Sequence, residues 1–353
     1  MSDAAGKQHV SIVVAGHVDA GKSSLTGRLL YDLGGIDERE MVKLRKIAEE
    51  NGKPSFAFAY YMDNQKAERE RGITIACNTK EFYTDRYHYT IIDAPGHRDF
   101  IKNMITGSSQ ADVALLLCPA DGGSFIASIA KGDHKTGEVP GQTRNHARLL
   151  NLLGVKQLII GVNKMDSDNS EGVPYTESRY IEVSTEVRRI LLQEGWRKDQ
   201  IEKEIPILPL AGFLGENLLK PSDKMTWWKG VDILVAATKE TVKVVCLLDA
   251  LNNMVNLPVR NLNAPLRAPV SNCLNIKGVG DVLTMRIEQG QVTKGDEVVF
   301  LPTHTSSNPC TGKVFSIEMH HKEHPNAGPG DNVGINMKGL VKGNMPKSGD
   351  IMI

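Results

Sequence analysis

A glycine-rich segment near the start of the chain carries residue types that bind phosphate. Residues 16–23 read Gly-His-Val-Asp-Ala-Gly-Lys-Ser and fit the pattern G-x-x-x-x-G-K-[ST]. Gly16 and Gly21 lack a Cβ, so backbone N–H groups can curl around phosphate oxygens there. Lys22 can reach the β- and γ-phosphates, and the Ser23 hydroxyl can ligate Mg²⁺. The segment predicts a nucleoside triphosphate site with these loop contacts: Gly16, His17, Val18, Asp19, Ala20, Gly21, Lys22, Ser23 and Ser24.

A second motif, Asp93-Ala94-Pro95-Gly96, follows the apolar residues 90–92. If those residues form a strand, Asp93 emerges at its end, where the carboxylate can hold Mg²⁺ through water. Gly96 supplies a backbone N–H for a γ-phosphate and a hinge that can move when that phosphate leaves. This pair predicts the end of the site at which the terminal phosphate lies.

The third motif, Asn163-Lys164-Met165-Asp166, indicates which base is bound. A carboxylate at Asp166 accepts hydrogen bonds from the N1 and N2 donors of guanine, and adenine offers no such pair. Leaving those partners unpaired costs several kcal/mol, which discriminates between the bases. This motif follows the two earlier ones in the sequence. The combination predicts a site for GTP and GDP that includes Asn163, Lys164 and Asp166.

The charged string at residues 68–75, Glu-Arg-Glu-Arg-Gly-Ile-Thr-Ile, has two interpretations. By composition it is a charged helix end that runs into a strand. In the functional interpretation it is a switch loop whose Thr74 closes over the γ-phosphate and Mg²⁺. The predicted metal ligands are then Ser23, Thr74 and Asp93.

These motifs need a scaffold that brings strand ends together, and the sequence provides an alternating one. Short apolar strands are predicted at 11–15, 89–93, 113–119, 157–163 and 205–210. Helices are predicted near 22–31, 99–107, 143–153 and 177–194, and the charged stretch 38–50 indicates a solvated helix. Such alternation is typical of a mostly parallel sheet with helices on both faces. Together with the three motifs it predicts an α/β P-loop GTPase domain.

The character of the sequence changes after about residue 255. A proline-spaced linker at 257–269 leads to short β-like runs broken by glycine, including 282–287 and 297–301. These runs suit a small antiparallel β-barrel. We therefore predict a GTP-binding domain at 1–255 and a β-barrel domain at 256–353.

Composition limits the class of protein. The 353 residues are 41% hydrophobic, and Lys+Arg and Asp+Glu balance at 42 each, so net charge does not indicate a nucleic-acid binder, although a local patch is compatible with it. The five cysteines are scattered without a C-x-x-C pair, which favours a reducing compartment. No apolar signal core or run of 18 apolar residues occurs, so the prediction is a cytoplasmic protein outside the membrane.

Longer strings at residues 66–75, 93–110 and 154–166 carry a resemblance to the translational GTPases of the elongation factor 1-alpha and elongation factor Tu family. The resemblance covers nearly the whole chain. It implies a GTPase that delivers aminoacyl-tRNA to the ribosome, hydrolyses GTP there, and is recharged by a guanine nucleotide exchange factor. It also implies a monomer.

The resemblance assigns roles to residues around the terminal phosphate. His97 takes the role of positioning the attacking water, where other GTPases use glutamine. The alternative is a surface histidine that caps the following helix. Val18 and Ile73 match a hydrophobic gate that keeps His97 from the water until the ribosome triggers hydrolysis.

Three departures from the family pattern affect what the resemblance implies. The loop that contacts guanine O6 usually begins with serine but reads Ala211-Gly212-Phe213, which removes a bracing hydrogen bond of about 1 kcal/mol while the Gly212 N–H remains as the O6 donor. Residues 129–140 appear as a longer loop, which favours the elongation-factor-like branch of the family. Residue 353 falls near the close of the second domain, whereas family members carry a further β-barrel, so a fragment of a longer protein is expected.

Other functions remain as alternatives. One is a termination or rescue GTPase, whose strings near the catalytic histidine tend to differ. Another is the GTPase subunit of a sulfate adenylyltransferase, which shares the string at residues 27–32. A scaffold protein that kept the fold would have no need of His97.

Overall fold

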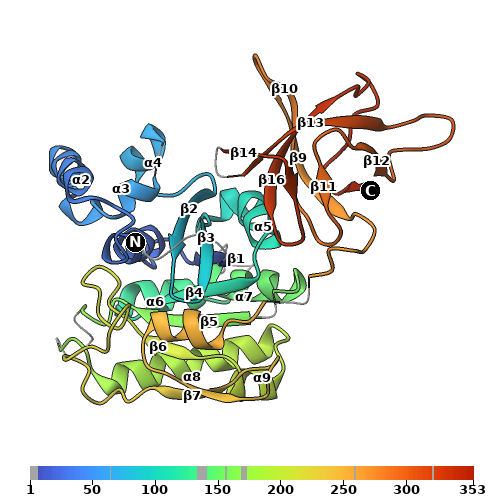
Figure 1. The fold of residues 1–353 in the computed structure, drawn as a ribbon. Helices are drawn as coiled ribbons and strands as arrows, with labels where there is room; N and C mark the ends of the chain where they lie inside the picture. The colour runs from blue at the N-terminus through green and yellow to red at the C-terminus, as the bar shows by residue number, and fades with distance from the viewer. Residues whose placement is uncertain are drawn as a thin grey trace. The chain divides into compact units, whose positions relative to one another are not determined.

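The computed structural model describes residues 7–63, 65–132, 141–155, 157–167, 173–257, 260–319 and 322–353. The chain divides into two compact units, Met1–Asn256 and Leu257–Ile353 (Figure 1). Among the described residues, no helix combines the length and the apolar character that a membrane crossing requires.

The first unit is built on a six-stranded sheet in the order β2-β3-β1-β4-β5-β6. All neighbouring strands are parallel except β2, which pairs antiparallel with β3 at one edge. The bounds of the strands are β1 Gln8–Gly16, β2 Asn78–Tyr83, β3 Tyr87–Asp93, β4 Val113–Pro119, β5 Gln157–Asn163 and β6 Ile207–Pro209. The predicted parallel α/β sheet is therefore confirmed, with a shorter last strand than expected.

The helices of this unit follow the strands. In Figure 1 the blue helices α2, α3 and α4 form a group well separated from α8 and α9. The bounds are α1 Lys22–Asp32, α2 Glu38–Glu50, η1 Pro54–Phe56, α3 Ala59–Met62, α4 Lys66–Arg71, η2 Arg98–Phe100, α5 Ile101–Ser109, α6 Gly122–Ile129, α7 Gln142–Leu152, α8 Glu177–Gln193, α9 Lys198–Lys203, α10 Leu247–Asp249 and η3 Ala250–Met254. A hairpin of β7 Val231–Leu234 and β8 Thr241–Val244 completes the unit.

Burial explains why the sheet forms where it does. Every residue of β4 is buried, because helices cover both faces of a parallel sheet and its central strand must be apolar throughout. Strand β2 was not predicted, since only Phe82 of its mixed residues is buried. At an edge, one partly covered strand needs no continuous apolar run.

The second unit is an antiparallel barrel. In the part of the unit that the structure describes, a seven-stranded sheet follows the order β12-β17-β9-β10-β16-β13-β14, and a further pairing of β12 with β13 closes the ring. Strands β11 and β15 form a separate pair. Along β13 the buried residues are Gly312, Val314 and Ile317, with a shift of register between Val314 and Ser316. The barrel core includes Leu283, Phe300 and Ile335. The bounds are β9 Ala268–Ile276, β10 Gly280–Arg286, β11 Val292–Thr293, β12 Glu297–Leu301, β13 Thr311–Met319, β14 Lys322–His324, β15 Asn326–Ala327, β16 Asn332–Lys338 and β17 Ile351–Met352. The predicted barrel is confirmed.

Candidate functional site

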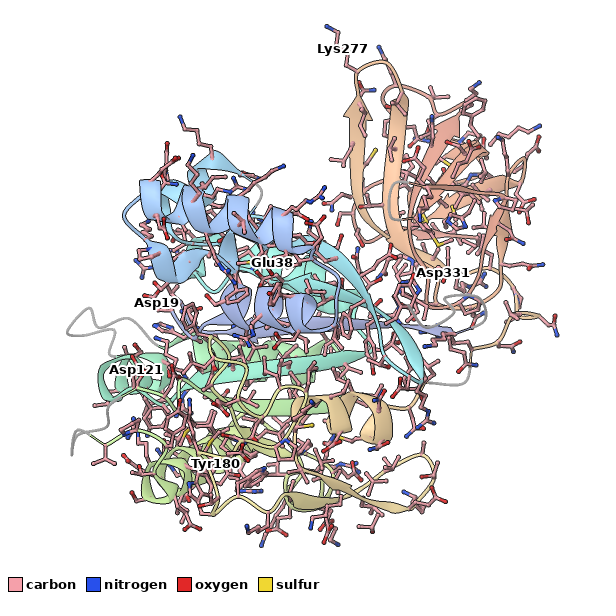
Figure 2. All side chains as sticks on the ribbon, turned by 60° about the vertical axis from the view of Figure 1, so that its left-hand side comes forward. Asp19, Glu38, Asp121, Tyr180, Lys277 and Asp331 are labelled. Carbon is pink, nitrogen blue, oxygen red and sulfur yellow. The ribbon has the colours of Figure 1, made fainter. Side chains whose placement is uncertain are left out.

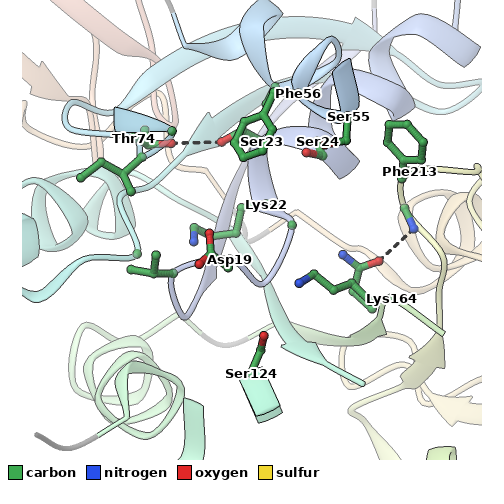
Figure 3. A pocket seen from close by; sticks show the side chains of 18 of the residues that line it. Asp19, Lys22, Ser23, Ser24, Ser55, Phe56, Thr74, Ser124, Lys164 and Phe213 are labelled. Carbon is green, nitrogen blue, oxygen red and sulfur yellow. Dashed lines mark hydrogen bonds between the residues drawn. The ribbon is translucent and has the colours of Figure 1, made fainter. Parts of the chain in front are cut away.

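A cavity of about 510 Å³ lies in the first unit, among loops that follow the carboxyl ends of parallel strands. In Figure 2, Asp19 and Asp121, which follow β1 and β4, lie at the same edge of the sheet. Figure 3 shows side chains that line the cavity. The lining residues are Val18, Asp19, Gly21, Lys22, Ser23, Ser24, Ser55, Phe56, Ala59, Asp63, Gly72, Ile73, Thr74, Gly96, His97, Ser124, Asn163, Lys164, Asp166, Ser167, Gly212 and Phe213.

The glycine-rich loop leads from β1 into α1 in a conformation that requires its glycines. Gly16 has φ 147° and Gly21 has φ 86°. A Cβ at Gly21 would come 2.5 Å from the Asn163 amide nitrogen, so a larger residue would displace the Asn163 side chain. Helix α1 begins at Lys22 with no side-chain cap, and its first N–H groups therefore face the cavity end without a helical partner. Such a helix start binds anions, and phosphate fits it.

Lys22 supplies the positive charge at this end of the cavity. It is buried, and its Nζ donates to the carbonyl oxygen of His17 at 2.8 Å. Burial lowers the pKa of Lys22, while Asp93 opposes that shift. A Cβ on Gly96 would collide with Lys22 Nζ, so only glycine lets the Asp93–Gly96 motif come this close.

Asp93 is a buried carboxylate near the Ser23 hydroxyl and Lys22. It is 0% exposed at the end of β3, and neither of its oxygens has a hydrogen bond within the described part of the chain. Burial raises the pKa of Asp93 to about 6, and the Ser23 hydroxyl and then Lys22 oppose this shift. A carboxylate left in this state fits a hydrated cation. The Ser23 and Thr74 hydroxyl oxygens, 3.0 Å apart, supply the oxygen ligands that Mg²⁺ prefers (Figure 3).

Asp63 is a carboxylate on the cavity wall that sequence reasoning missed. Its Oδ1 accepts a hydrogen bond from the Thr74 hydroxyl at 3.2 Å. Burial, then Asp93 and Glu68, raise the pKa of Asp63 to about 7. Arg69 fixes its backbone, because the guanidinium donates to the Asp63 carbonyl oxygen at 2.7 Å. Asp63 lies outside every recognisable motif, so only its neighbours in space identify it.

Asn163 ties together the loops at the opposite end of the cavity. Its Nδ2 donates to the Ala20 carbonyl at 2.8 Å, and its Oδ1 accepts from the Gly212 N–H at 2.8 Å. The predicted O6 donor, Gly212, is therefore engaged by Asn163, and an O6 contact would have to share or exchange that N–H. Ala211 is buried and does not line the cavity.

Phe213 and Lys164 border the region expected to hold the base. Phe213 is 40% exposed, and its carbonyl oxygen accepts from Arg28 at 3.1 Å. Its ring meets Phe58 edge-on, with centroids 5.9 Å apart. Lys164 lies 3.6 Å from Asp121, which orients the ammonium along the cavity wall. Asp166 lines the same cavity.

His97 lines the cavity together with Val18 and Ile73. The Nδ1 of His97 also accepts from the Asp99 N–H at 3.2 Å, so the histidine caps η2. The cap uses Nδ1 and leaves Nε2 for another partner, so it is compatible with the water-positioning role, which stays a prediction. The predicted gate residues are brought to the same cavity as His97.

The predicted loop contacts Gly16, His17 and Ala20 lie behind the cavity rather than on its wall. The Gly16 N–H donates to Nδ1 of buried His146 at 3.0 Å, and Gln142 N–H donates to Nδ1 of His17 at 3.2 Å. In the structure, these hydrogen bonds hold Gly16 and His17 on the side of the loop that faces away from the cavity. The long loop predicted at 129–140 falls largely on residues 133–140, outside the described residues.

His146 should make stability depend on pH. Burial, with Lys22 and His17, lowers the pKa of His146 to about 3, whereas the unfolded chain keeps the ordinary value of 6.5. As the pH falls below 6.5, the unfolded state binds a proton at His146 that the folded state does not bind. The contribution of neutral His146 to the free energy of unfolding is therefore fully present above pH 6.5 and is lost toward pH 3. We expect a loss of about 1.4 kcal/mol per pH unit from this residue.

The measurement is urea unfolding between pH 7.5 and 5 for the native chain and for His146→Asn. Asparagine keeps an acceptor for the Gly16 N–H but does not titrate. The variant should therefore lose less free energy of unfolding as the pH falls. Parallel pH profiles for the two proteins would contradict this role of His146.

Comparisons with known proteins give the relatives of the chain. It matches the family model for the elongation factor Tu GTP binding domain at residues 7–257 and that for elongation factor Tu domain 2 at 280–352. Elongation factor 1-alpha of Picrophilus torridus is 43% identical over 345 residues, 98% of this chain and 71% of that protein. Elongation factor 1-alpha of Entamoeba histolytica is 46% identical over 335 residues, which are 95% of this chain and 67% of that protein.

Among solved structures, the GTP-bound Ski7 GTPase-like domain of S. cerevisiae matches with a TM-score of 0.72 and 20% identity, over 98% of this chain and 75% of that chain. A bacterial selenocysteine-specific elongation factor, EF-Sec, matches with a TM-score of 0.60 and 21% identity, and the match covers 98% of this chain and 45% of that chain. At these identities the likeness shows the fold alone.

Proposed function

Because this chain belongs to the elongation factor Tu-like family of translational GTPases, we propose that it binds aminoacyl-tRNA when loaded with GTP and delivers it to the ribosome, where GTP is hydrolysed to GDP and phosphate. The observation that carries this proposal is the single cavity at which the phosphate loop, Thr74, His97 and the Asn163–Asp166 motif meet. Elongation factor relatives support the translational role.

The phosphates would lie at the start of α1. The loop N–H groups and Lys22 would hold the β- and γ-phosphates, and Gly96, which lies beside Lys22 Nζ, would face the γ-phosphate. Ser23 and Thr74 would ligate Mg²⁺ directly, with Asp93 acting through water. When bound, Mg²⁺ neutralises charge on the phosphate oxygens.

The guanine base would lie between Lys164 and Phe213, with Asp166 accepting its N1 and N2 donors. Asn163 braces this end by joining the Ala20 and Gly212 backbones.

Hydrolysis requires a positioned water molecule. His97 orients it toward the γ-phosphate through Nε2, while Val18 and Ile73 keep the imidazole back until the ribosome is engaged. Slow intrinsic turnover and stimulation by a partner follow from that arrangement. We further propose a monomeric, cytoplasmic protein whose GDP is released by an exchange factor.

A tRNA retention experiment tests the delivery step. The immobilised chain, loaded with a non-hydrolysable GTP analogue or with GDP, is mixed with aminoacyl-tRNA and with deacylated tRNA. We expect retention only of aminoacyl-tRNA and only by the triphosphate form. Elongation factor 1-alpha of Picrophilus torridus serves as the positive control. Retention by that control and none by this chain would contradict the proposal.

A further inference from the structure

Glu68 is a charged side chain with no access to solvent. It lies in α4 and is 0% exposed. Its Oε2 accepts from the Gln65 N–H at 3.0 Å, and its Oε1 accepts from the N–H groups of Ile75 at 3.0 Å and Ala76 at 3.1 Å. A buried carboxylate is costly unless it is hydrogen-bonded, so these donors are what keep Glu68 inside.

The backbone of the same residue holds the other half of the turn. The carbonyl oxygen of Glu68 accepts from the N–H groups of Gly72 at 2.7 Å and Ile73 at 3.2 Å. Glu68 therefore engages the backbone on both sides of Thr74. Gly72 has φ 74°, the left-handed conformation that lets the chain leave α4 and fold back over Glu68.

Thr74, at the centre of this turn, lines the cavity together with Gly72 and Ile73. Thr74 is buried, and its hydroxyl lies 3.0 Å from Ser23 Oγ and 3.2 Å from Asp63 Oδ1. A shift of the turn by an ångström would break both contacts. The place of Thr74 thus depends on a side chain that does not itself line the cavity.

We propose that Glu68 is a positioning residue for GTP: it holds residues 72–76 so that Thr74 and Ile73 cover the γ-phosphate. The inference rests on the proposed role of Thr74 in the site. GDP has no γ-phosphate, and it therefore gains little from this turn. The signature of Glu68 is a selective loss of GTP affinity rather than a general loss of nucleotide binding.

Glu68→Gln removes this function with little change of volume. Whichever way the amide is turned, its NH₂ group faces a backbone N–H donor, either that of Gln65 or those of Ile75 and Ala76. Glu70→Gln is the matched control, because Glu70 lies in the same helix, is 62% exposed and pairs only loosely with Lys66 at 3.5 Å.

The test compares the dissociation constants of a non-hydrolysable GTP analogue and of GDP, in Mg²⁺, for the native chain, Glu68→Gln, Glu70→Gln and Thr74→Val. Single-turnover GTP hydrolysis and the melting temperature are measured beside them. For Glu68→Gln we expect analogue binding roughly tenfold weaker and slower hydrolysis. GDP binding should stay within about twofold of the native value, and Glu70→Gln should match the native chain.

If Glu68→Gln weakens the binding of GDP and of the analogue equally, or weakens neither, the ratio of the two dissociation constants stays at the native value. Glu68 is then a structural residue only, and the proposal is overturned. If Thr74→Val leaves the ratio unchanged, the assignment of Thr74 to the site fails first. If Thr74→Val loses the preference for the analogue over GDP while Glu68→Gln keeps it, only the inference about Glu68 is overturned. Should Glu68→Gln not fold, Glu68→Asp decides by the same ratio, because the shorter carboxylate cannot reach both groups of donors.

Discussion

Replacing His97 with alanine is expected to leave GTP binding near the native level and to slow ribosome-stimulated GTP hydrolysis by roughly 10²- to 10⁴-fold. The imidazole lines the cavity but is not among the groups that hold the phosphates, so its loss should affect the rate and not the affinity. The measurement is single-turnover hydrolysis with and without ribosomes, alongside GTP binding. Stimulation by ribosomes also separates an elongation role from the sulfate adenylyltransferase alternative.

The cap that His97 provides to η2 needs its own control. His97→Asn keeps a side-chain oxygen that can accept from the Asp99 N–H, but it lacks Nε2. If the rate loss arises from water positioning, asparagine should be as slow as alanine. Recovery of stimulated hydrolysis in His97→Asn would assign the effect to the cap, and persistent turnover in His97→Ala would mean that another group positions the water.

Asp166→Asn should change the preferred nucleotide from GTP to xanthosine triphosphate. The amide keeps an acceptor for guanine N1 but offers a donor where the carboxylate would accept from guanine N2. One hydrogen bond is therefore lost, the other loses its charge assistance, and a donor faces a donor. We expect GTP affinity to fall by roughly 10²- to 10⁴-fold. Competition binding with GTP, xanthosine triphosphate and ATP measures the change.

Asn163→Ala provides the contrast for this base-reading role. Asn163 joins the Ala20 and Gly212 backbones, so its loss should weaken GTP and xanthosine triphosphate alike. A selective switch in Asp166→Asn together with a uniform loss in Asn163→Ala would separate base recognition from loop bracing. GTP affinity that is unchanged in Asp166→Asn would refute the assignment.

Local signals in the sequence account for the elements that were predicted. The fully apolar run 113–119 could only be a covered strand, and β4 has these bounds. The glycine pattern at 16–23 gave the loop before α1, because left-handed backbone and close approach both need glycine. Strand β2 and helix α6 were not predicted. Strand β2 has a single buried residue, and α6 begins with two glycines, which are poor helix formers, although Asp121 is its N-cap.

The sequence by itself determined the parallel sheet, the barrel, the phosphate loop and the choice of guanine, because each depends on residue types at short, regular spacing. Only the tertiary structure decided that Asp63 joins Thr74, that His146 supports Gly16 from behind, that Asn163 engages Gly212, and that Glu68 organises the turn around Thr74. These contacts depend on backbone N–H groups and buried carboxylates whose partners are set by how the chain folds back on itself. The spacing of residues along the chain does not indicate such pairings.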